Sequence, residues 1–343
     1  MAPRPATGSR TSRRQKTSRR GAARSRAREA KLDTGPELRG AATLAALGIA
    51  GLALLGAAAR LYPPFDTFRS LWIHLGAVMI LGGGVLLILR APRRGLAAAA
   101  FGAFFALLPL KTAFLDAQPL ADAAGRPLKV LTFNAFIHNR QASQLAAMLL
   151  DSDYDIIAIQ EGATLWDHFP RLDEGFRARA GCETPERCDL VLLSRLPLDD
   201  VRWTPYDTRP HRLVTATISL GDREVGIAAT HLTKPHHDGV QRYEGYRLIR
   251  ALRNLPDDAV LMGDFNAAPW SDLLEWVREE SGMRIVAGYR PTAPARLGPL
   301  AIPIDHVLVR GGMGVSRIDR LPGPLGSNHF GVEADLSIAG APR

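Results

Sequence analysis

Three long apolar stretches dominate the first third of the chain. Residues 41–59 and residues 71–89 contain no Lys, Arg, Asp or Glu, and a third apolar stretch begins at residue 95. A helix that crosses a bilayer needs about 20 apolar residues, with about 17 as the lower limit. The pattern predicts about three transmembrane helices, at about 41–59, 71–89 and 95–115, and the third is long enough only if it continues past Lys111.

A different pattern starts after a short linker of Ala, Asp, Gly and Pro at residues 116–127. Short apolar runs between turn residues predict strands, and apolar positions three or four residues apart predict helices. Many strands with a few helices between them predict an α/β (α+β) domain of more than two layers over residues 128–340. The expected helices cover residues 142–150, 240–255 and 271–280, and the expected strands cover residues 130–136, 156–160, 190–193, 213–220, 225–230, 260–262, 304–309 and 330–338.

The charge of the chain is concentrated at its N-terminus. The net charge is +9, and residues 1–40 alone contain twelve Lys and Arg against three Asp and Glu. This segment has too few apolar residues to offset the entropy of ordering, so we expect a disordered tail. A basic tail beside a membrane helix suits anionic lipid, with nucleic acid as the alternative partner. Residues 121–343 carry 25 basic and 29 acidic residues, which argues mildly against bulk duplex DNA as the substrate.

Positive charges flank the cytoplasmic ends of membrane helices and therefore predict orientation. The basic tail places the N-terminus in the cytoplasm, loop 60–70 outside, and Arg90, Arg93 and Arg94 inside. With three spans in an inner (cytoplasmic) membrane, the domain that follows is extracytoplasmic (periplasmic), whereas with two spans it is cytoplasmic. The chain has two cysteines, Cys182 and Cys188, and an exported domain favours a disulfide between them over free thiols.

Polar side chains follow several of the predicted strands, where catalytic groups tend to be displayed. Carboxylates, side-chain amides and histidines together suit one hard divalent cation with oxygen ligands, plus donors aimed at a phosphate. These residues are Asn134, Glu161, His231, Asp264, Asn266, Asp305, Asn328 and His329.

The motifs around these residues occur in a characteristic order. They are Thr-Phe-Asn at 132–134, Gln-Glu at 160–161, Thr-His-Leu at 230–232, Gly-Asp-Phe-Asn-Ala at 263–267, Ile-Asp-His at 304–306 and Ser-Asn-His at 327–329. In order and wording the chain resembles the endonuclease/exonuclease/phosphatase superfamily across about residues 128–338. The resemblance implies a four-layer αββα sandwich, with two sheets packed face to face and helices outside.

The resemblance also implies roles for the carboxylates and amides. Glu161 would bind the metal ion, Mg²⁺ or Mn²⁺, with Asn134 beside it. Asp264 would orient or deprotonate the attacking water, and Asn266 would hydrogen-bond the phosphate. Asn328 stands where the family usually has Asp before the final His, so this candidate metal ligand keeps an oxygen acceptor but lacks the charge.

The histidines receive roles in the same way. His329, held by Asp305, would stabilise charge on the phosphoryl group or on the leaving oxygen, because a carboxylate behind an imidazole fixes its tautomer. His231 would donate to a phosphate oxygen. Arg209 and Arg212 lie in a polar stretch ahead of a strand and are candidate substrate contacts.

Two functions compete at this point. The first is a membrane-anchored, metal-dependent hydrolase of phosphoester bonds in nucleic acid, a lipid headgroup or a small phosphoester. The second is a membrane-tethered binding module of the same fold that has lost catalysis. The retained Glu161, Asp264 and His329 favour the hydrolase, and the neutral Asn328 is the one feature that favours the binding module. The sequence indicates no protein partner.

Overall fold

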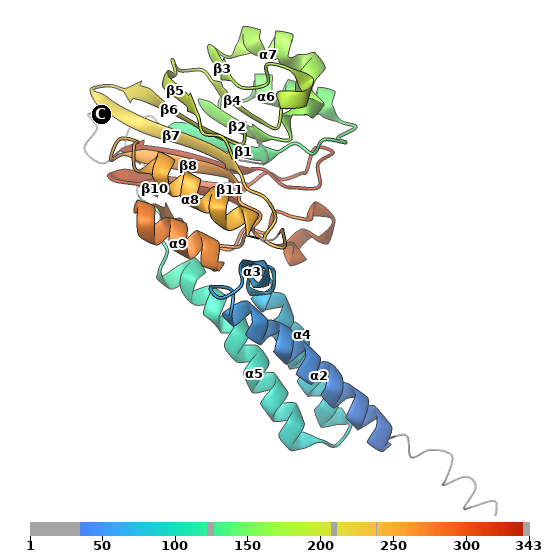
Figure 1. Cartoon of the computed structure of the whole chain (residues 1–343). Coiled ribbons are helices and arrows are strands. Elements are labelled where there is room, and N and C mark those ends of the chain that lie inside the picture. Colours follow the sequence, from blue (N-terminus) through green and yellow to red (C-terminus); the bar gives the residue numbers. More distant parts are fainter. Residues whose placement is uncertain (1–34, 122–126, 207–210, 238, 339–343) are drawn as a thin grey trace, which may run out of the picture.

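The computed structural model describes residues 35–121, 127–206, 211–237 and 239–338. Most of the predicted tail, at residues 1–34, and the candidate substrate contact Arg209 lie outside the described residues. The described chain has two parts, a bundle of apolar helices and a sandwich of two sheets, and Figure 1 shows the bundle extending away from one end of the sandwich.

The bundle consists of three apolar helices, here called the anchor. They are α2 (Gly35–Ala57), α4 (Trp72–Ile88) and α5 (Pro92–Leu110), which a π-helical turn at Lys111–Leu115 continues. Helix α2 and the continuous segment Pro92–Leu115 are each long and apolar enough to cross a membrane, and α4 qualifies together with the bent segment Pro63–Ser70. The third apolar stretch therefore continues past Lys111, as three spans require.

The first helix starts earlier than the sequence pattern predicted. Helix α2 begins at Gly35, so residues 35–40 are helical and do not belong to a disordered tail. Pro36 and Glu37 lie in its first turn, where a fixed backbone angle and a negative charge both favour a helix N-terminus. Within the anchor, a side chain on Gly76 would lie 2.5 Å from the carbonyl oxygen of Gly102, so small residues allow α4 and α5 to pack closely.

The sandwich contains two six-stranded sheets. The first has the order β11-β12-β1-β2-β4-β3 and the second has the order β5-β6-β7-β8-β10-β9. The strands are β1 (Leu128–Asn134), β2 (Ile156–Gln160), β3 (Ala178–Ala180), β4 (Leu190–Ser194), β5 (Asp199–Trp203), β6 (Leu213–Leu220), β7 (Arg223–His231), β8 (Ala259–Asp264), β9 (Arg284–Ile285), β10 (Asp305–Arg310), β11 (Met313–Arg320) and β12 (Val332–Ile338).

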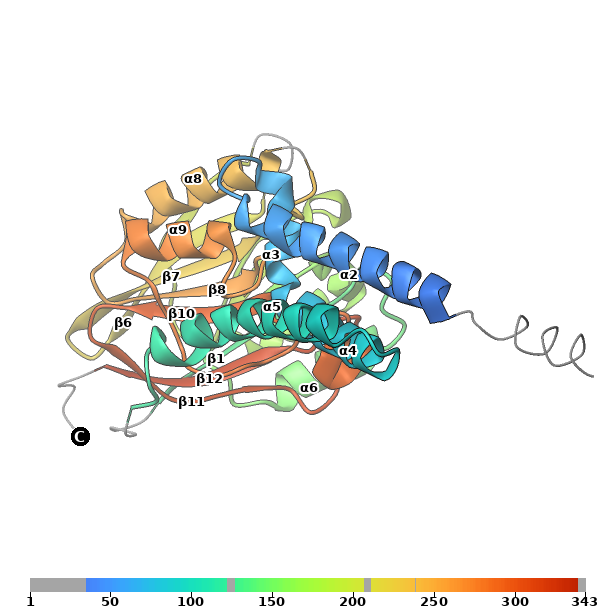
Figure 2. The same ribbon diagram turned by 90° about the horizontal axis from the view of Figure 1, so that it is seen from below.

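Helices cover the outer face of each sheet. Figure 2 shows α8 (Val240–Leu252) and α9 (Asp272–Ser281) outside the second sheet and α6 (Ala142–Asp151) outside the first. Helix α7 (Phe169–Gly175) packs with α6 in the same apolar cluster. The inner faces of both sheets bury alternate residues of their strands in one continuous core, among them Val130, Ile156, Val260 and Val309. The four-layer αββα sandwich is confirmed.

Several elements were not predicted from the sequence. Strand β11 alternates buried residues with exposed or half-buried polar ones, and its two Arg and one Asp weaken its apolar signal. Strands β3, β5 and β9 are short or largely exposed, so their apolar content is low. Pairing in the sheets, which is a long-range property, decides these segments.

The anchor and the sandwich meet at a junction formed by residues 60–72, which connect α2 to α4, and residues 268–275 of the domain. Trp72 and Phe105 pack in one buried cluster with Ala268 and Trp270. The short helix α3 (Asp66–Ser70) lies between the two parts in Figure 1, and its Asp66 carboxylate accepts hydrogen bonds from the first two backbone N–H groups of α9. Loop 58–71 and the end of α5 therefore lie on the same side of the anchor as the domain.

Candidate active site

Sheet register aligns three of the predicted site residues. Strands β7 and β8 are parallel with His231 beside Asp264, and β8 and β10 are antiparallel with Asp264 beside Asp305. Adjacent strands lie about 4.8 Å apart, so these side chains form one row at the edge of the second sheet. Gly263 allows this close pairing, because a Cβ there would lie 2.0 Å from the carbonyl oxygen of Thr230.

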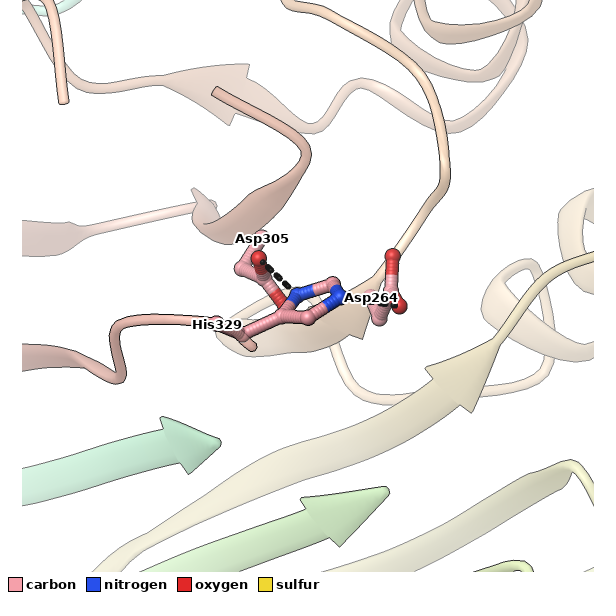
Figure 3. A group of neighbouring side chains, drawn as sticks. All are labelled: Asp264, Asp305 and His329. Atoms are coloured by element: carbon pink, nitrogen blue, oxygen red, sulfur yellow. Dashed lines mark hydrogen bonds and ion pairs between the residues drawn. The ribbon is translucent and has the colours of Figure 1, made fainter. Parts of the chain in front are cut away.

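His329 comes to this row from the loop before β12. Its Nδ1 lies 2.8 Å from Oδ2 of Asp305, and its Nε2 lies 4.0 Å from Oδ2 of Asp264 (Figure 3). All three side chains are buried, and their ligand atoms lie within 4.8 Å of one another. The predicted pairing of His329 with Asp305 is present, and the free edge of the imidazole points toward Asp264.

A second imidazole approaches Asp264 from the other side. Nε2 of His231 lies 3.6 Å from Oδ2 of Asp264, and its Nδ1 lies 3.0 Å from Oδ1 of Asp189. Two carboxylate–histidine pairs, Asp189–His231 and Asp305–His329, therefore flank the same oxygen of Asp264. Each carboxylate fixes the orientation of the imidazole in front of it.

Asp189 was not identified from the sequence. It follows Cys188 directly and precedes β4, and its acidic character in a polar segment carries no motif that distinguishes it from a surface residue. The disulfide between Cys182 and Cys188, six residues apart, closes the loop that ends at Asp189. The contact with His231 spans 42 positions of sequence, so only the folded chain reveals it.

Arg212 has a different place from the one predicted. It is only 5% exposed, and its guanidinium donates to the carboxylate of Asp189 and to the backbone oxygen of His231. This predicted substrate contact is therefore a buried group that holds Asp189 and His231 in place through its hydrogen bonds.

The first sheet contributes Asn134 and Glu161 to the same edge. Strands β1 and β2 are parallel with Asn134 beside Gln160, so Glu161 follows immediately. The Asn134 Nδ2 donates to Glu161 Oε1 at 3.2 Å and to Asp264 Oδ2 at 3.1 Å. The second oxygen of Glu161 accepts from the backbone N–H of Ile137 at 2.7 Å. The predicted metal ligand and the predicted base therefore converge on one amide group.

The backbone at this edge adopts unusual conformations. Phe136, Glu161 and Asn266 have φ angles of 62°, 53° and 49°, in the left-handed region that non-glycine residues rarely adopt. Such conformations persist where the surrounding fold holds them, and they are common at functional sites. Asn266 donates from Nδ2 to the backbone oxygen of Leu232 at 2.8 Å, which holds its amide beside the row.

Asn328 marks the solvent-exposed border of the site, here called its mouth. It is exposed, whereas His329 beside it is buried, and its backbone oxygen accepts from the N–H of Ala295 at 2.7 Å. The candidate metal ligand therefore borders the buried row from outside.

Burial and crowding of charge perturb two members of the row. Burial raises the pKa of Asp264, and the nearby Asp305 carboxylate raises it further. Burial by itself lowers the pKa of His329, but the charges of Asp305 and Asp264 outweigh it and raise the pKa to about 9. His329 is therefore a proton donor at neutral pH, and the site combines an acid and a base within a few ångströms.

The donor set fits a hard divalent cation. Two carboxylate oxygens, from Glu161 and Asp264, converge on the same amide of Asn134. Oδ1 of Asp305 is buried and has no hydrogen-bond partner among the described residues. Buried carboxylates that are close together and incompletely paired favour a bound positive charge.

Comparisons with known proteins agree with this geometry. A search of curated proteins gave no match. A solved endonuclease/exonuclease/phosphatase from Beutenbergia cavernae DSM 12333 is 20% identical, with a TM-score of 0.52 over 64% of this chain and 73% of that one. A functionally unknown conserved protein from Enterococcus faecalis V583 is 16% identical, with a TM-score of 0.50 over 61% of this chain and 99% of that one. At these identities the two structures share the fold.

The sequence profile of the Endonuclease/Exonuclease/phosphatase family matches residues 131–329, which include the row, the whole second sheet and the final histidine. The chain therefore belongs to the endonuclease/exonuclease/phosphatase family, whose members hydrolyse phosphoester bonds.

Proposed function

We propose that this chain is a membrane-anchored, divalent-cation-dependent hydrolase of phosphoester bonds. The observation that carries the proposal is the pair of carboxylate-backed imidazoles, Asp189–His231 and Asp305–His329, on either side of the buried Asp264. Hydrolysis of a phosphoester needs a group that activates water and donors that stabilise charge on the phosphoryl oxygens, and this arrangement supplies both.

Asp264 is the group that orients and deprotonates the attacking water. Its raised pKa makes it a better base than an exposed carboxylate, and the bond from the Asn266 backbone N–H to its Oδ1, at 2.8 Å, fixes its direction. Its other oxygen faces both histidines. A water held by this carboxylate therefore lies between the donors that contact the phosphate.

His329 and His231 stabilise the charge that develops during attack. His329 carries a proton at neutral pH and gives it to the leaving oxygen, while Asp305 holds the positive charge of the ring in place. In its doubly protonated form, His231 donates from Nδ1 to Asp189 and from Nε2 to a nonbridging oxygen. Donors that are already oriented are worth about 3–4 kcal/mol each in comparable sites.

Glu161 is the residue that would hold the cation, with the amide of Asn134 beside it and Asn328 at the mouth. Mg²⁺ or Mn²⁺, bound there, would neutralise charge on the phosphate. A neutral Asn328 lowers the negative charge at the mouth, so it is expected to weaken cation binding.

The test uses the full chain in detergent micelles. We expect hydrolysis of bis(p-nitrophenyl) phosphate with Mg²⁺ or Mn²⁺, loss of hydrolysis with chelator, and a fall of about 10²-fold in His329→Gln. His168→Gln, which changes a histidine outside the site, is the matched control. A folded chain that binds the cation but hydrolyses no phosphomonoester or phosphodiester would instead support the binding module.

We also propose that the domain lies outside the cytoplasm. The support is the charge pattern of the anchor, in which Arg90, Arg93 and Arg94 adjoin the turn between α4 and α5, away from the domain. A disulfide in the domain suits an oxidising compartment. A phosphatase reporter fused to the C-terminus is expected to be active, and a reporter that is active only in the cytoplasm would overturn the orientation.

A further inference from the structure

One short loop connects the site to the anchor. The helical turn at Ala295–Leu300, here called the bridging loop, bonds through the N–H of Ala295 to the backbone oxygen of Asn328 at 2.7 Å. At its other end, the backbone oxygen of Leu300 lies 2.8 Å from Nε2 of His74 in the first turn of α4. The loop therefore touches both the mouth of the site and a membrane helix.

The length of α4 places this contact at the membrane surface. Helix α4 has 17 residues, and at about 1.5 Å per residue it is about 25 Å long. The hydrocarbon core of a bilayer is about 30 Å thick, slightly more than the length of α4, so the first turn of α4 and the bent segment Pro63–Ser70 before it lie near the boundary. Because Leu300 contacts His74 in that turn, the bridging loop lies at the same level.

The site cannot be far from that level. Ala295 and Leu300 are five positions apart, and a fully extended chain of that length spans at most about 18 Å. The headgroup layer adds about 5–7 Å on each side of the hydrocarbon. The mouth of the site therefore lies within about 18 Å of the level at which Leu300 contacts α4, close to the layer that contains lipid headgroups.

The side chains of the bridging loop suit that layer. Leu297 is 46% exposed and Leu300 is 68% exposed, and Arg296 and Pro299 are exposed as well. On another part of the mouth, Ile137 is 53% exposed directly beside the Glu161 carboxylate. Exposed leucines beside an arginine are typical of segments that bind a membrane interface. The leucine side chains enter the lipid, and the guanidinium faces anionic headgroups.

We propose that the substrate is a membrane-resident amphiphile with a phosphoester headgroup, and that Leu297 and Leu300 enter the lipid interface to present it to the site. This inference rests on the proposed hydrolase. Water gives a proton to Asp264 and adds its oxygen to phosphorus, the bond from phosphorus to one alcohol oxygen breaks, and that oxygen takes a proton from His329. The lipid alcohol and the headgroup phosphate separate.

Charge favours this substrate over nucleic acid. Residues 121–343 carry 29 acidic against 25 basic residues, whereas proteins that bind nucleic acid tightly neutralise several phosphates with Lys and Arg. A lipid substrate needs little such affinity, because the anchor already holds the site at the surface where the lipid is concentrated.

The test compares two substrates for the same chain. The full chain is reconstituted into vesicles of phosphatidylcholine, phosphatidylethanolamine, phosphatidylglycerol and sphingomyelin, and the release of water-soluble phosphate ester is measured beside hydrolysis of bis(p-nitrophenyl) phosphate. The double variant Leu297→Glu with Leu300→Glu should lower lipid turnover at least tenfold and change turnover of the soluble diester less than twofold. Val201→Glu, at an apolar residue that is 41% exposed on the edge strand β5, is the matched control.

Turnover of the soluble diester also reports whether each variant is folded. If the glutamates lower both activities, Leu297→Ser with Leu300→Ser replaces them, and an equal loss of both activities there would overturn the proposal. A wild-type chain that hydrolyses the soluble diester or single-stranded DNA but none of the lipids would overturn it too, while the proposed hydrolase would stand. A chain that hydrolyses nothing would overturn the hydrolase itself.

Discussion

The junction and the active site both bury carboxylates, but they satisfy them in opposite ways. At the junction, each oxygen of Asp66 accepts a backbone N–H, and the Asp272 carboxylate meets Arg60, Arg69 and Arg242. In the site, Asp264 lies close to Asp305, among two imidazoles and an amide, and Oδ1 of Asp305 has no hydrogen-bond partner among the described residues.

The carboxylates at the junction therefore have a structural role, and those in the site have a chemical role. A buried carboxylate with complete partners holds two parts of a chain in one orientation, and removing a partner is costly. Buried carboxylates with incomplete partners cost stability, and they persist where a cation, a proton or a substrate completes them. We therefore expect changes at the junction to affect stability and orientation, and changes in the site to affect turnover.

The largest effect is expected for Asp264→Asn. The variant removes the base and should lower turnover about 10³-fold, which is about 4 kcal/mol. Because burial and the Asp305 charge raise the pKa of Asp264, a neutral side chain should leave the unfolding temperature unchanged or raise it. Thermal unfolding and turnover in micelles check both statements, with the exposed Asp319→Asn as control. A variant that unfolds more easily and keeps its turnover would give Asp264 a structural role.

Cation binding should stabilise the site and leave the junction unaffected. At a Mg²⁺ concentration about 100 times the dissociation constant, the free energy of unfolding should rise by about 3 kcal/mol. Chelator should reverse the gain, and Glu161→Gln should abolish it. Unfolding of the domain, followed by its tryptophan fluorescence at several Mg²⁺ concentrations, measures the effect. An equal gain in Glu161→Gln would move the cation away from this carboxylate.

Arg69→Met should test the junction. The guanidinium donates to the backbone oxygen of Trp270 and to Glu275, both at 2.7 Å, and lies 3.7 Å from Asp272. Losing these partly buried bonds should cost about 2 kcal/mol of stability, with turnover of a soluble diester changed less than twofold. Arg202→Met, on an exposed part of β5, is the control. Loss of turnover without loss of stability would make Arg69 a part of the site.

Asp189→Asn should have the smallest effect in free energy, because Asp189 acts on turnover only by positioning His231. We expect turnover to fall about tenfold, or about 1.4 kcal/mol. Burial alone would raise the pKa of Asp189, but His231 and Arg212 lower it from 3.8 to about 2. The ionised carboxylate therefore stabilises the fold above pH 4, and this contribution is lost as the pH falls from about 4 toward 2. The free energy of unfolding, measured across that pH range, should fall in the wild type and not in Asp189→Asn. The same fall in both proteins would contradict the pairing of Asp189 with His231 and Arg212.

Much of the architecture was predictable because its signals are local. Strands at residues 156–160 and 213–220 were predicted with the bounds that the structure has, since short apolar runs between turns are visible in sequence. The two-sheet sandwich followed from the resemblance of the motifs. Helices α2, α4 and α5 followed from the length of the apolar stretches, although α2 begins six residues earlier than predicted.

The sequence by itself determined which residues stand at the strand ends, among them Asn134, Glu161 and Asp264. Only the tertiary structure decided how they meet, because sheet register aligns His231, Asp264 and Asp305, and register depends on pairing between distant strands. The same holds for Asp189, and for the junction, where Arg60 and Asp272 are 212 positions apart. A partner that distant leaves no periodic pattern in the chain, since its contact is made by folding and not by neighbouring residues.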